Sequence, residues 1–356
     1  MKQKLIFTNV VGEAVDAEVA ALGSPEVFVI TDTNVAERVL PLLKNESEAV
    51  AHATVIEVPA GETHKELGTL ASIWQKLMAA GATRKSVAIN VGGGVIGDMG
   101  GFAAAAFKRG MRCINVPTTL LSAVDASVGG KTAVNFGGMK NQIGVFAEPE
   151  AAIISTIYFN TLPGTEILSG YAEMLKHALL KDSATLHRLL NYSPVYPVFD
   201  SEALLPLLRE SVEVKRRIVS EDLTEQGIRK ALNLGHTAGH AFESLAMARQ
   251  SPVPHGYAVA WGMIVELILS HLQLKFPTAI LHDFAEYVKR NYGFFAIDCK
   301  DYPALLAAMR QDKKNATAED INFTLLEAPG KPVIDCTVSD DDIKTALDIY
   351  RDLLGI

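Results

Sequence analysis

The sequence contains only three cysteines in 356 residues, and they lie far apart. Cys113, Cys299 and Cys336 have neither the paired spacing of a cysteine zinc module nor the density of a disulfide-rich secreted domain. This cysteine usage fits a reducing compartment. Any metal ion must therefore be bound by histidine and carboxylate side chains.

The chain also lacks an excess of positive charge. It has 33 lysines and arginines against 41 aspartates and glutamates, which gives a formal net charge of -8 and a pI near 5.6. Nucleic acids and anionic membrane surfaces attract basic proteins. We therefore expect neither as a partner, and any local cluster of lysines requires a specific explanation.

Long hydrophobic runs are missing as well. The N-terminal segment MKQKLIFTNV holds a three-residue apolar run, far too short for the core of a signal peptide, so we expect a cytoplasmic protein. The most apolar later stretch, from Tyr257 to Ser270, is interrupted by Glu266 and is shorter than the roughly 20 residues of a spanning helix. It is interpreted as a buried helix.

Two different periodicities divide the chain. In the first part, short β-branched runs alternate with amphipathic stretches, a rhythm typical of a parallel α/β sheet. After Thr161, leucine and alanine recur at helical spacing, and the breaker Leu162-Pro163-Gly164 marks the change. The expected strands are Val27–Thr31, Thr54–Val58, Val87–Val91 and Arg112–Val116, with a last apolar run at Ala151–Ile157, and the expected helices include Ala203–Val219, His236–Met247 and Val259–Leu274.

Glycines follow the third of these strands, from Gly92 to Asp98. Glycines at a turn from strand to helix let backbone N–H groups approach a pyrophosphate, although the spacing differs from G-x-G-x-x-G and also suits a plain tight turn. Asp32 and Asn34 end the first strand, and Glu62 and Lys65 follow the second. They could bind ribose hydroxyls, or Asp32 and Asn34 could merely cap the next helix.

The segment Pro117–Thr132 places Asp125, a glycine pair and Lys131 close together. It is not the P-loop of a nucleotide triphosphatase, because Asp125 stands where that motif requires glycine. Lys131, Lys140 and Asn141 instead indicate an anion site, with solvated surface lysines as the alternative.

Four further residues could hold a metal ion. Glu173 lies three residues before Lys176 on one helical face, which alone would suggest an exposed ion pair. His236 and His240 are four residues apart, a spacing that suits metal binding, and His255 follows in a proline-rich loop. A single histidine is more often structural, but the combination favours a metal site.

Together these motifs resemble the 3-dehydroquinate synthase family, and the match runs nearly end to end. The resemblance rests on Gly92–Asp98, Val116–Thr132, Glu173 with Lys176, Asn233–Glu243 and His255-Gly256. It implies an N-terminal Rossmann-like NAD-binding α/β domain over residues 1–160 and a mainly α-helical metal- and substrate-binding domain over residues 161–356. It also implies a homodimer, in which Arg109 reaches the neighbouring subunit's site.

The resemblance implies a role for each site residue. The metal ligands would be Glu173, His236 and His255, and the ion zinc or cobalt. The NAD contacts would be Asp32, Asn34, Glu62, Lys65, Gly93, Gly94, Val95, Asp98, Thr118, Thr119, Lys131, Lys140, Thr161 and Glu166. The catalytic residues would be Asp125, Lys131, Lys176, Lys215 and His240, and the substrate contacts Arg109, Lys140, Asn141, Arg229, Asn233 and Lys313.

The implied reaction converts 3-deoxy-D-arabino-heptulosonate 7-phosphate to 3-dehydroquinate and phosphate, a step of the shikimate pathway. It proceeds by transient NAD oxidation, phosphate elimination, re-reduction, ring opening and aldol cyclisation. The alternatives are another sugar phosphate cyclase, a metal-dependent polyol dehydrogenase of the glycerol dehydrogenase type, and an inactive NAD-binding scaffold. Arg229 and Asn233 favour a substrate that bears a carboxylate.

Overall fold

The computed structural model describes residues 3–195, 199–311 and 320–355, which divide into two compact units. Unit 1 contains Met1–Pro163 and Phe199–Val212, and unit 2 contains Gly164–Val198 and Glu213–Ile356. Helix α9 (Ser201–Glu221) contributes to both units. Its first part joins unit 1 although it follows the boundary expected at residue 160.

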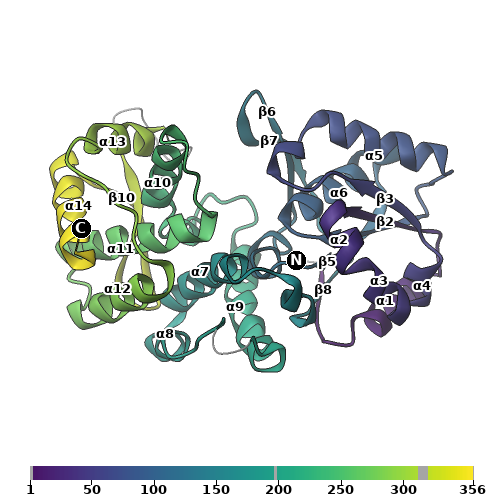
Figure 1. The fold of residues 1–356 in the computed structure, drawn as a ribbon, viewed down its shortest axis with the longest axis horizontal. Helices are drawn as coiled ribbons and strands as arrows, with labels where there is room; N and C mark the ends of the chain where they lie inside the picture. The colour runs from purple at the N-terminus through teal and green to yellow at the C-terminus, as the bar shows by residue number, and fades with distance from the viewer. Residues whose placement is uncertain (1–2, 196–198, 312–319, 356) are drawn as a thin grey trace. The chain divides into compact units, whose positions relative to one another are not determined.

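Unit 1 is built on a six-stranded parallel sheet with the order β1-β8-β5-β4-β2-β3 (Figure 1). Its strands are β1 (Lys4–Phe7), β2 (Val27–Asp32), β3 (Thr54–Val58), β4 (Val87–Gly92), β5 (Arg112–Pro117) and β8 (Ala151–Ile154). The four expected strands and the α/β fold class are confirmed. The short edge strand β1 was not expected, because its sequence gives only a three-residue apolar run.

Alternating side chains give the sheet two apolar faces, as a parallel sheet covered on both sides requires. Val27 and Val29 pack with helices α1 (Val11–Ala21) and α3 (Leu40–Glu46), whereas Phe28 and Ile30 pack with helices α5 (Leu67–Ala79) and α6 (Gly94–Ala106). The helices of this unit are α1 (Val11–Ala21), α2 (Thr33–Arg38), α3 (Leu40–Glu46), α4 (Glu48–Ala51), α5 (Leu67–Ala79) and α6 (Gly94–Ala106), with shorter turns η1 (Glu62–His64), η2 (Phe107–Arg109), η3 (Ser122–Ala126) and η4 (Ile157–Thr161).

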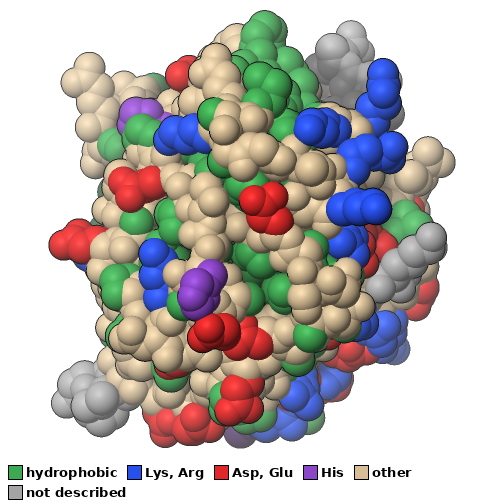
Figure 2. Space-filling model, turned by 90° about the vertical axis from the view of Figure 1, so that its right-hand side faces the viewer, with side chains coloured by type: hydrophobic (Ala, Val, Ile, Leu, Met, Phe, Trp, Pro, Cys, Tyr) green, Lys and Arg blue, Asp and Glu red, His purple; other side chains and the backbone are tan. Residues whose placement is uncertain are grey.

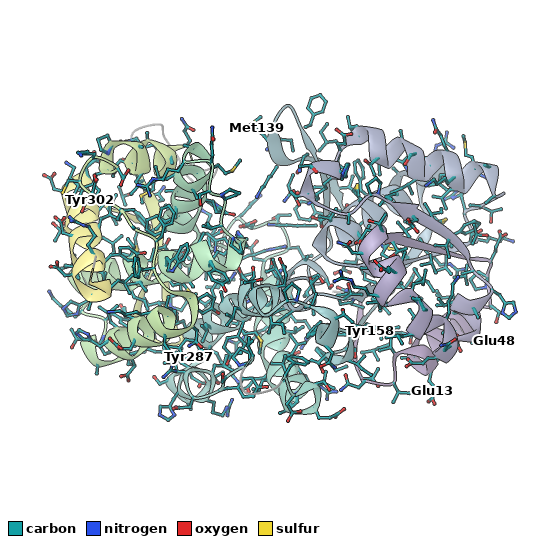
Figure 3. The ribbon with its side chains drawn as sticks, viewed as in Figure 1. Glu13, Glu48, Met139, Tyr158, Tyr287 and Tyr302 are labelled. Atoms are coloured by element: carbon teal, nitrogen blue, oxygen red, sulfur yellow. The ribbon has the colours of Figure 1, made fainter. Side chains whose placement is uncertain are left out.

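A β-hairpin of unit 1, β6 (Lys131–Phe136) and β7 (Met139–Phe146), was not recognised in the sequence. Its two-residue turn, Gly137-Gly138, has positive φ at both positions, as a type I′ turn requires. Met139 lies beside this turn with an exposed side chain (Figure 3). Since Lys131 opens a strand and not a helix, the segment differs from a P-loop, as expected.

Unit 2 is mainly helical, as predicted, and adds one small antiparallel sheet. Its elements are α7 (Gly164–Lys181), α8 (Ser183–Leu190), the rest of α9, η5 (Ile228–Asn233), α10 (His236–Ala248), α11 (His255–Leu274), α12 (Thr278–Tyr292), α13 (Tyr302–Arg310), β9 (Asn322–Ala328), β10 (Lys331–Thr337) and α14 (Asp340–Leu354). Helix α11 is long and apolar enough to cross a membrane by length and composition, but 72% of its most apolar window is buried in the protein. It is therefore the core helix that the sequence indicated.

Glycines let three helices of unit 2 approach one another closely. A Cβ atom on Gly262 of α11 would overlap the carbonyl oxygen of Gly235 and the amide of Gly239, at the start of α10. A Cβ on Gly256 would overlap the backbone of Ser169 on α7. The helices α7, α10 and α11 therefore pack backbone against backbone at these points.

Figure 2 shows acidic and basic side chains on one face of the molecule, with apolar patches between them. Such mixed charge is common on protein surfaces.

The close crossing of α10 and α11 predicts that Gly262→Ala destabilises the protein. The added methyl group has to displace backbone atoms, and overpacking of this kind costs about 3 kcal/mol. The measurement is the urea concentration at the unfolding midpoint. The control is Gly97→Ala, because Gly97 lies within α6 with open space around its Cβ, and alanine there should raise stability by about 0.5–1 kcal/mol. Equal midpoints for the two variants would contradict the prediction.

Candidate functional site

The strand order of unit 1 creates a natural crevice. From β2 the chain continues to β3 on one side, whereas from β4 it continues to β5 on the other, so the direction reverses between β2 and β4. Ligands of open α/β sheets bind outside the carboxyl ends of the strands at such a switch point. Of the predicted NAD residues, Asp32 is the last residue of β2, and Gly93 and Thr118 directly follow β4 and β5.

The glycine segment forms the turn from β4 into α6. Gly93 is the residue before the helix, and Gly94 and Val95 are its first two residues, so their backbone N–H groups belong to the first helical turn. These N–H groups have no partner within the helix and can bind an anion. Thr118 donates its backbone N–H to Gly92 O (3.0 Å), which holds the end of β5 beside this turn.

Asp32 caps the helix that follows it. Its Oδ1 accepts the backbone N–H groups of Asn34 (3.0 Å) and Val35 (3.1 Å). Burial raises the pKa of Asp32, although the two backbone bonds oppose the shift. The capping interpretation therefore holds for Asp32, whereas Asn34 lies within α2 and donates to the cap.

A polar network connects several predicted residues of unit 1. Lys65 is almost fully buried, and its Nζ donates to Asp98 Oδ2 (2.6 Å) on α6 and to Asn141 Oδ1 on β7. Burial raises the pKa of Asp98, and the charge of Lys65 partly offsets the effect. Asn135 extends the network, since its Nδ2 donates to Glu62 Oε1 (2.9 Å) and its Oδ1 accepts the N–H of Asn141 (2.9 Å).

The remaining predicted residues of unit 1 occupy turns and strand ends. Thr119 Oγ1 donates to Ser122 Oγ (2.9 Å) at the start of η3. Asp125 lies in η3 and is half-buried, while Lys131 and Lys140 are exposed on the hairpin. Thr161 ends η4 and donates to Tyr158 O (2.7 Å).

Three predicted metal ligands meet in unit 2. Glu173 lies on α7, His236 is the first residue of α10, and His255 is the first residue of α11. Glu173 Oε1 lies 3.5 Å from His236 Nε2 and 3.7 Å from His255 Nε2. One ligand atom from each residue lies within 4.8 Å of the other two.

Each of the two histidines is held by a neighbouring group. His236 Nδ1 lies 3.2 Å from Leu234 O, and His255 Nδ1 lies 3.4 Å from Glu243 Oε2. With a proton on each Nδ1, both Nε2 atoms direct their lone pairs toward Glu173, and such partners commonly fix metal-binding histidines.

The backbone at the start of α11 is held as well. Gly256 N–H donates to Ser169 Oγ (3.0 Å), and Ser169 lies one turn before Glu173 on α7. His255 is therefore fixed next to the helix that carries the carboxylate.

The donor set fits a divalent metal ion. Ligand atoms around a tetrahedral ion with bonds of about 2.0–2.1 Å lie about 3.3 Å apart, close to the distances between Glu173 and the histidines. Glu173 is 1% exposed, and neither of its oxygens accepts a hydrogen bond from the described residues, although Lys176 forms an ion pair with Oε2. Lys176 thus pairs with one oxygen of this buried carboxylate, while the other oxygen faces the two histidines, where a divalent cation would be bound by all three side chains.

The other predicted residues of unit 2 have varied positions. His240 is exposed on α10, with its ring 5.4 Å from that of His236, and Lys176 and Lys215 are buried. Arg229 is 2% exposed and donates to Leu223 O (2.7 Å), and Asn233 donates to Glu225 Oε1 (3.0 Å). Glu166 is exposed in the first turn of α7. Lys313 lies outside the described residues.

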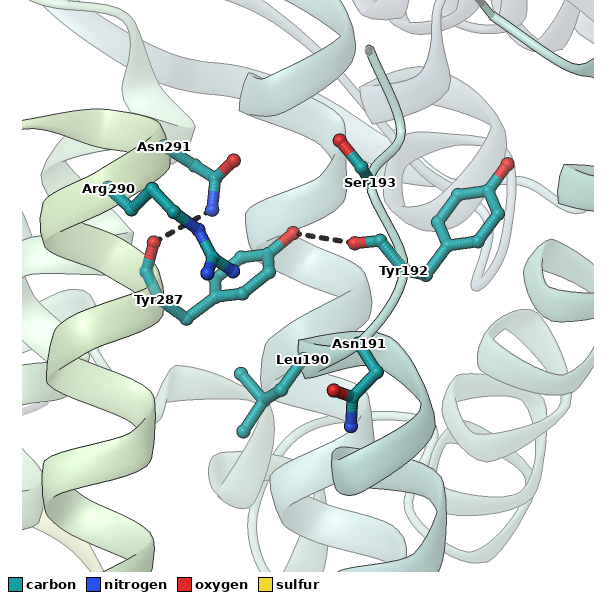
Figure 4. Close-up of a pocket in the computed structure, with 7 residues that line it drawn as sticks. All are labelled: Leu190, Asn191, Tyr192, Ser193, Tyr287, Arg290 and Asn291. Atoms are coloured by element: carbon teal, nitrogen blue, oxygen red, sulfur yellow. Dashed lines mark hydrogen bonds between the residues drawn. The ribbon is translucent and has the colours of Figure 1, made fainter. Parts of the chain in front are cut away.

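A cavity of about 440 Å³ lies elsewhere in unit 2 (Figure 4). Tyr287 OH donates to Tyr192 O (3.2 Å) across it, and Asn291 Nδ2 donates to Tyr287 O (2.9 Å). It is lined by Leu190, Asn191, Tyr192, Ser193, Tyr287, Arg290 and Asn291, a set without carboxylates or histidines. The candidate site is therefore the group formed by Glu173, His236 and His255, and not this cavity.

The sequence analysis missed the supporting groups. Asn135, Ser169 and Glu243 received no role, because an asparagine, a serine or a helical glutamate carries no signal of its own. The role of Glu243 would have been the easiest of the three to predict, since it lies seven residues after His236 and therefore two helical turns along the same face.

Comparison with known proteins gives consistent matches. The family model "3-dehydroquinate synthase N-terminal" matches residues 55–169, and "3-dehydroquinate synthase C-terminal" matches residues 170–315. A 3-dehydroquinate synthase of Parabacteroides distasonis is 43% identical over 100% of this chain and 99% of its own length. One from Listeria monocytogenes is 42% identical over 89% of this chain and 85% of its own length.

Solved structures with the same fold include two sugar phosphate cyclases. A 2-epi-5-epi-valiolone synthase from Streptomyces hygroscopicus subsp. jinggangensis with NAD+ and Zn2+ bound has a TM-score of 0.84 at 25% identity, covering 98% of this chain and 96% of that one. A 2-deoxy-scyllo-inosose synthase complexed with carbaglucose-6-phosphate, NAD+ and Co2+ has a TM-score of 0.85 at 23% identity, with the same coverage. Since the family models match most of the chain and the relative from Parabacteroides distasonis matches all of it, the chain belongs to the 3-dehydroquinate synthase family.

Proposed function

We propose that this protein converts 3-deoxy-D-arabino-heptulosonate 7-phosphate to 3-dehydroquinate and inorganic phosphate. The observation that carries the proposal is the 43% identity, over the whole chain, with a 3-dehydroquinate synthase. The step belongs to the shikimate pathway of aromatic amino acid biosynthesis.

Unit 1 would bind NAD at the carboxyl ends of β2, β4 and β5. The first N–H groups of α6, at Gly94 and Val95, suit the pyrophosphate; Asp98 supplies a carboxylate one turn along the same helix, and Asp32 supplies one at the end of β2. The valiolone synthase of the same fold, which has NAD+ and Zn2+ bound, supports NAD as the cofactor. When bound, NAD supplies a reversible hydride acceptor, so that it is not consumed overall.

In unit 2, Glu173, His236 and His255 would hold Zn2+ or Co2+. The bound ion supplies a Lewis acid that makes a ring hydroxyl of the substrate more acidic. Three protein ligands leave a coordination position for that hydroxyl. His240 lies beside this cluster and forms a second group of possible ligands with Glu243 and His255; we assign it to the substrate on the strength of the family resemblance.

The cationic side chains explain how an acidic protein binds a trianionic substrate. Lys131, Lys140, Asn141 and Lys176 would bind the phosphate, whose departure leaves charge that these groups stabilise. Arg229 and Asn233 would bind the carboxylate. Asp125, Lys215 and Lys313, the last of which lies outside the described residues, are assigned to the substrate by the family resemblance alone.

We propose a cytoplasmic homodimer in which Arg109 completes the neighbouring site. Arg109 is exposed, and it forms no hydrogen bond or ion pair with any other part of the chain that the structure describes. Lys108 and Arg109 both have positive φ, an unusual conformation for non-glycine residues that is typical of functional turns.

The function can be tested by following phosphate. The purified protein with NAD and Zn2+ should release one phosphate per heptulosonate phosphate consumed, without net formation of NADH. Faster turnover of sedoheptulose 7-phosphate or glucose 6-phosphate would instead indicate a sibling cyclase, and stoichiometric NADH would indicate a polyol dehydrogenase.

The two histidines of α10 should differ in role. His236→Ala removes a metal ligand, so we expect it to lose bound zinc, whereas His240→Ala should retain zinc and lose turnover. Elemental analysis after dialysis measures the zinc content. Equal loss of zinc in both variants would assign the two histidines the same role.

Prolonged chelation should also abolish activity, and added Zn2+ or Co2+ should restore it.

If Arg229 binds the substrate carboxylate, replacing it should strongly lower kcat/KM. A guanidinium binds a carboxylate through two charge-assisted hydrogen bonds, and losing this contact in the transition state costs about 2.7 kcal/mol. Arg229→Ala should therefore lower kcat/KM for the heptulosonate phosphate by about a hundredfold, with zinc content unchanged. Arg229→Lys should also be impaired, because lysine keeps the charge without the fork. An unchanged kcat/KM in Arg229→Ala would reject the assignment.

A further inference from the structure

Glu266 is a buried carboxylate in the apolar core helix α11. Its side chain is 0% exposed. Oε2 accepts the backbone N–H of Gly235 (2.6 Å), and Oε1 accepts those of Thr237 (3.0 Å) and Ala238 (3.2 Å). The carboxylate therefore binds the N-terminus of α10 from the neighbouring helix.

The three hydrogen bonds surround His236, the first residue of α10. Its preceding neighbour Gly235 is bound by one oxygen, and its following neighbour Thr237 is bound by the other. Burying a carboxylate is costly unless it is hydrogen-bonded, and the positive end of a helix is a favourable place for it. The interaction thus fixes the backbone on both sides of His236.

The fixed backbone determines where the imidazole points. His236 Nδ1 faces Leu234 O at 3.2 Å, within the same segment, and Nε2 faces Glu173 Oε1 at 3.5 Å. Gly235 has φ +81, a left-handed conformation that few residues other than glycine adopt readily. Without Glu266, this segment would lose three of the bonds that hold its geometry.

We propose that Glu266 is a positioning residue for the divalent metal ion: it sets the affinity of the site by holding the segment that presents His236. The proposal rests on the proposed function, since it assumes that Glu173, His236 and His255 bind the ion. Partners that orient metal ligands typically change metal affinity by about 10- to 100-fold when they are replaced.

The test is the Zn2+ affinity of Glu266→Gln, measured by competition with a chromophoric chelator. Glutamine has the same shape, but its NH2 group replaces one acceptor, so a donor faces a donor at one end of the segment. We expect the dissociation constant for Zn2+ to rise by about 10- to 100-fold. The melting temperature of the metal-free variant, measured in parallel, reports stability alone.

Ser270→Ala is the matched control. Ser270 lies one turn after Glu266 and is also 0% exposed; its hydroxyl donates to the backbone carbonyl of Glu266 (2.6 Å) and accepts the N–H of Leu326 from β9 (3.0 Å). Its loss leaves the buried N–H of Leu326 without a partner and removes a bond to the backbone of Glu266, but the Glu266 carboxylate keeps its three bonds to the start of α10, so stability should fall while the segment around His236 stays in place. Ser270→Ala should therefore melt at a lower temperature than wild type and bind Zn2+ as tightly.

The outcomes separate this inference from the proposed function. If the wild type does not bind Zn2+, or if it binds Zn2+ no more tightly than His236→Ala does, the proposed metal site is wrong. If the wild type binds Zn2+ and Glu266→Gln binds it equally well, or if Ser270→Ala weakens binding as much, the role of Glu266 is structural and the inference is overturned. Should Glu266→Gln not fold, Glu266→Asp decides, because it keeps the charge but shortens the reach; unchanged affinity there overturns the inference too.

Discussion

Unit 2 depends on how it accommodates carboxylates that are taken out of water. Glu173 and Glu266 are both almost fully buried, one on α7 and one on α11. A buried charge requires hydrogen bonds or a counter-charge. Glu266 obtains three backbone N–H groups at the start of α10, whereas Glu173 has Lys176 on one side and two histidines on the other.

Both histidines near Glu173 stand at the first position of a helix, His236 in α10 and His255 in α11. A side chain there projects from the end of the helix, toward whatever the terminus contacts. The start of α10 is held by Glu266, and the start of α11 is held by Ser169. Both termini are therefore fixed by hydrogen bonds to neighbouring helices, and the glycines at Gly256 and Gly262 allow the approach that these bonds need.

Sequence patterns predicted the fold class, four strands of the sheet, the helical second half and the residues that meet around Glu173. They succeeded where the signal is local: buried β-branched runs, helical spacing, and rare residue types such as histidine. They missed β1, the hairpin β6–β7 and the pair β9–β10. β1 has only four residues and the hairpin is largely exposed, so these strands lack the apolar runs that distinguish the central strands. β9 does carry a buried run, but it lies in the second half of the chain, where helical spacing dominates the sequence.

The supporting interactions could not be predicted because they join residues far apart in the chain. Ser169 and Gly256, or Asn135 and Glu62, become neighbours only once the helices and the hairpin have packed. Glu266 did carry a signal, since a single carboxylate in an apolar helix must be satisfied somewhere. Its partner could not be named, because any of several helix termini or cations would have met the same requirement.

The polar network of unit 1 bears on how NAD would bind. Lys65 is already paired with Asp98 and Asn141, and Glu62 with Asn135. A nucleotide that takes up these groups must replace hydrogen bonds that the protein makes with itself, so its affinity reflects the difference between two sets of bonds. In exchange, the network fixes the side chains before the ligand arrives and reduces the entropy lost on binding. The same reasoning applies to the proposed metal ligands His236 and His255, whose rings already contact Leu234 O and Glu243 in the protein itself.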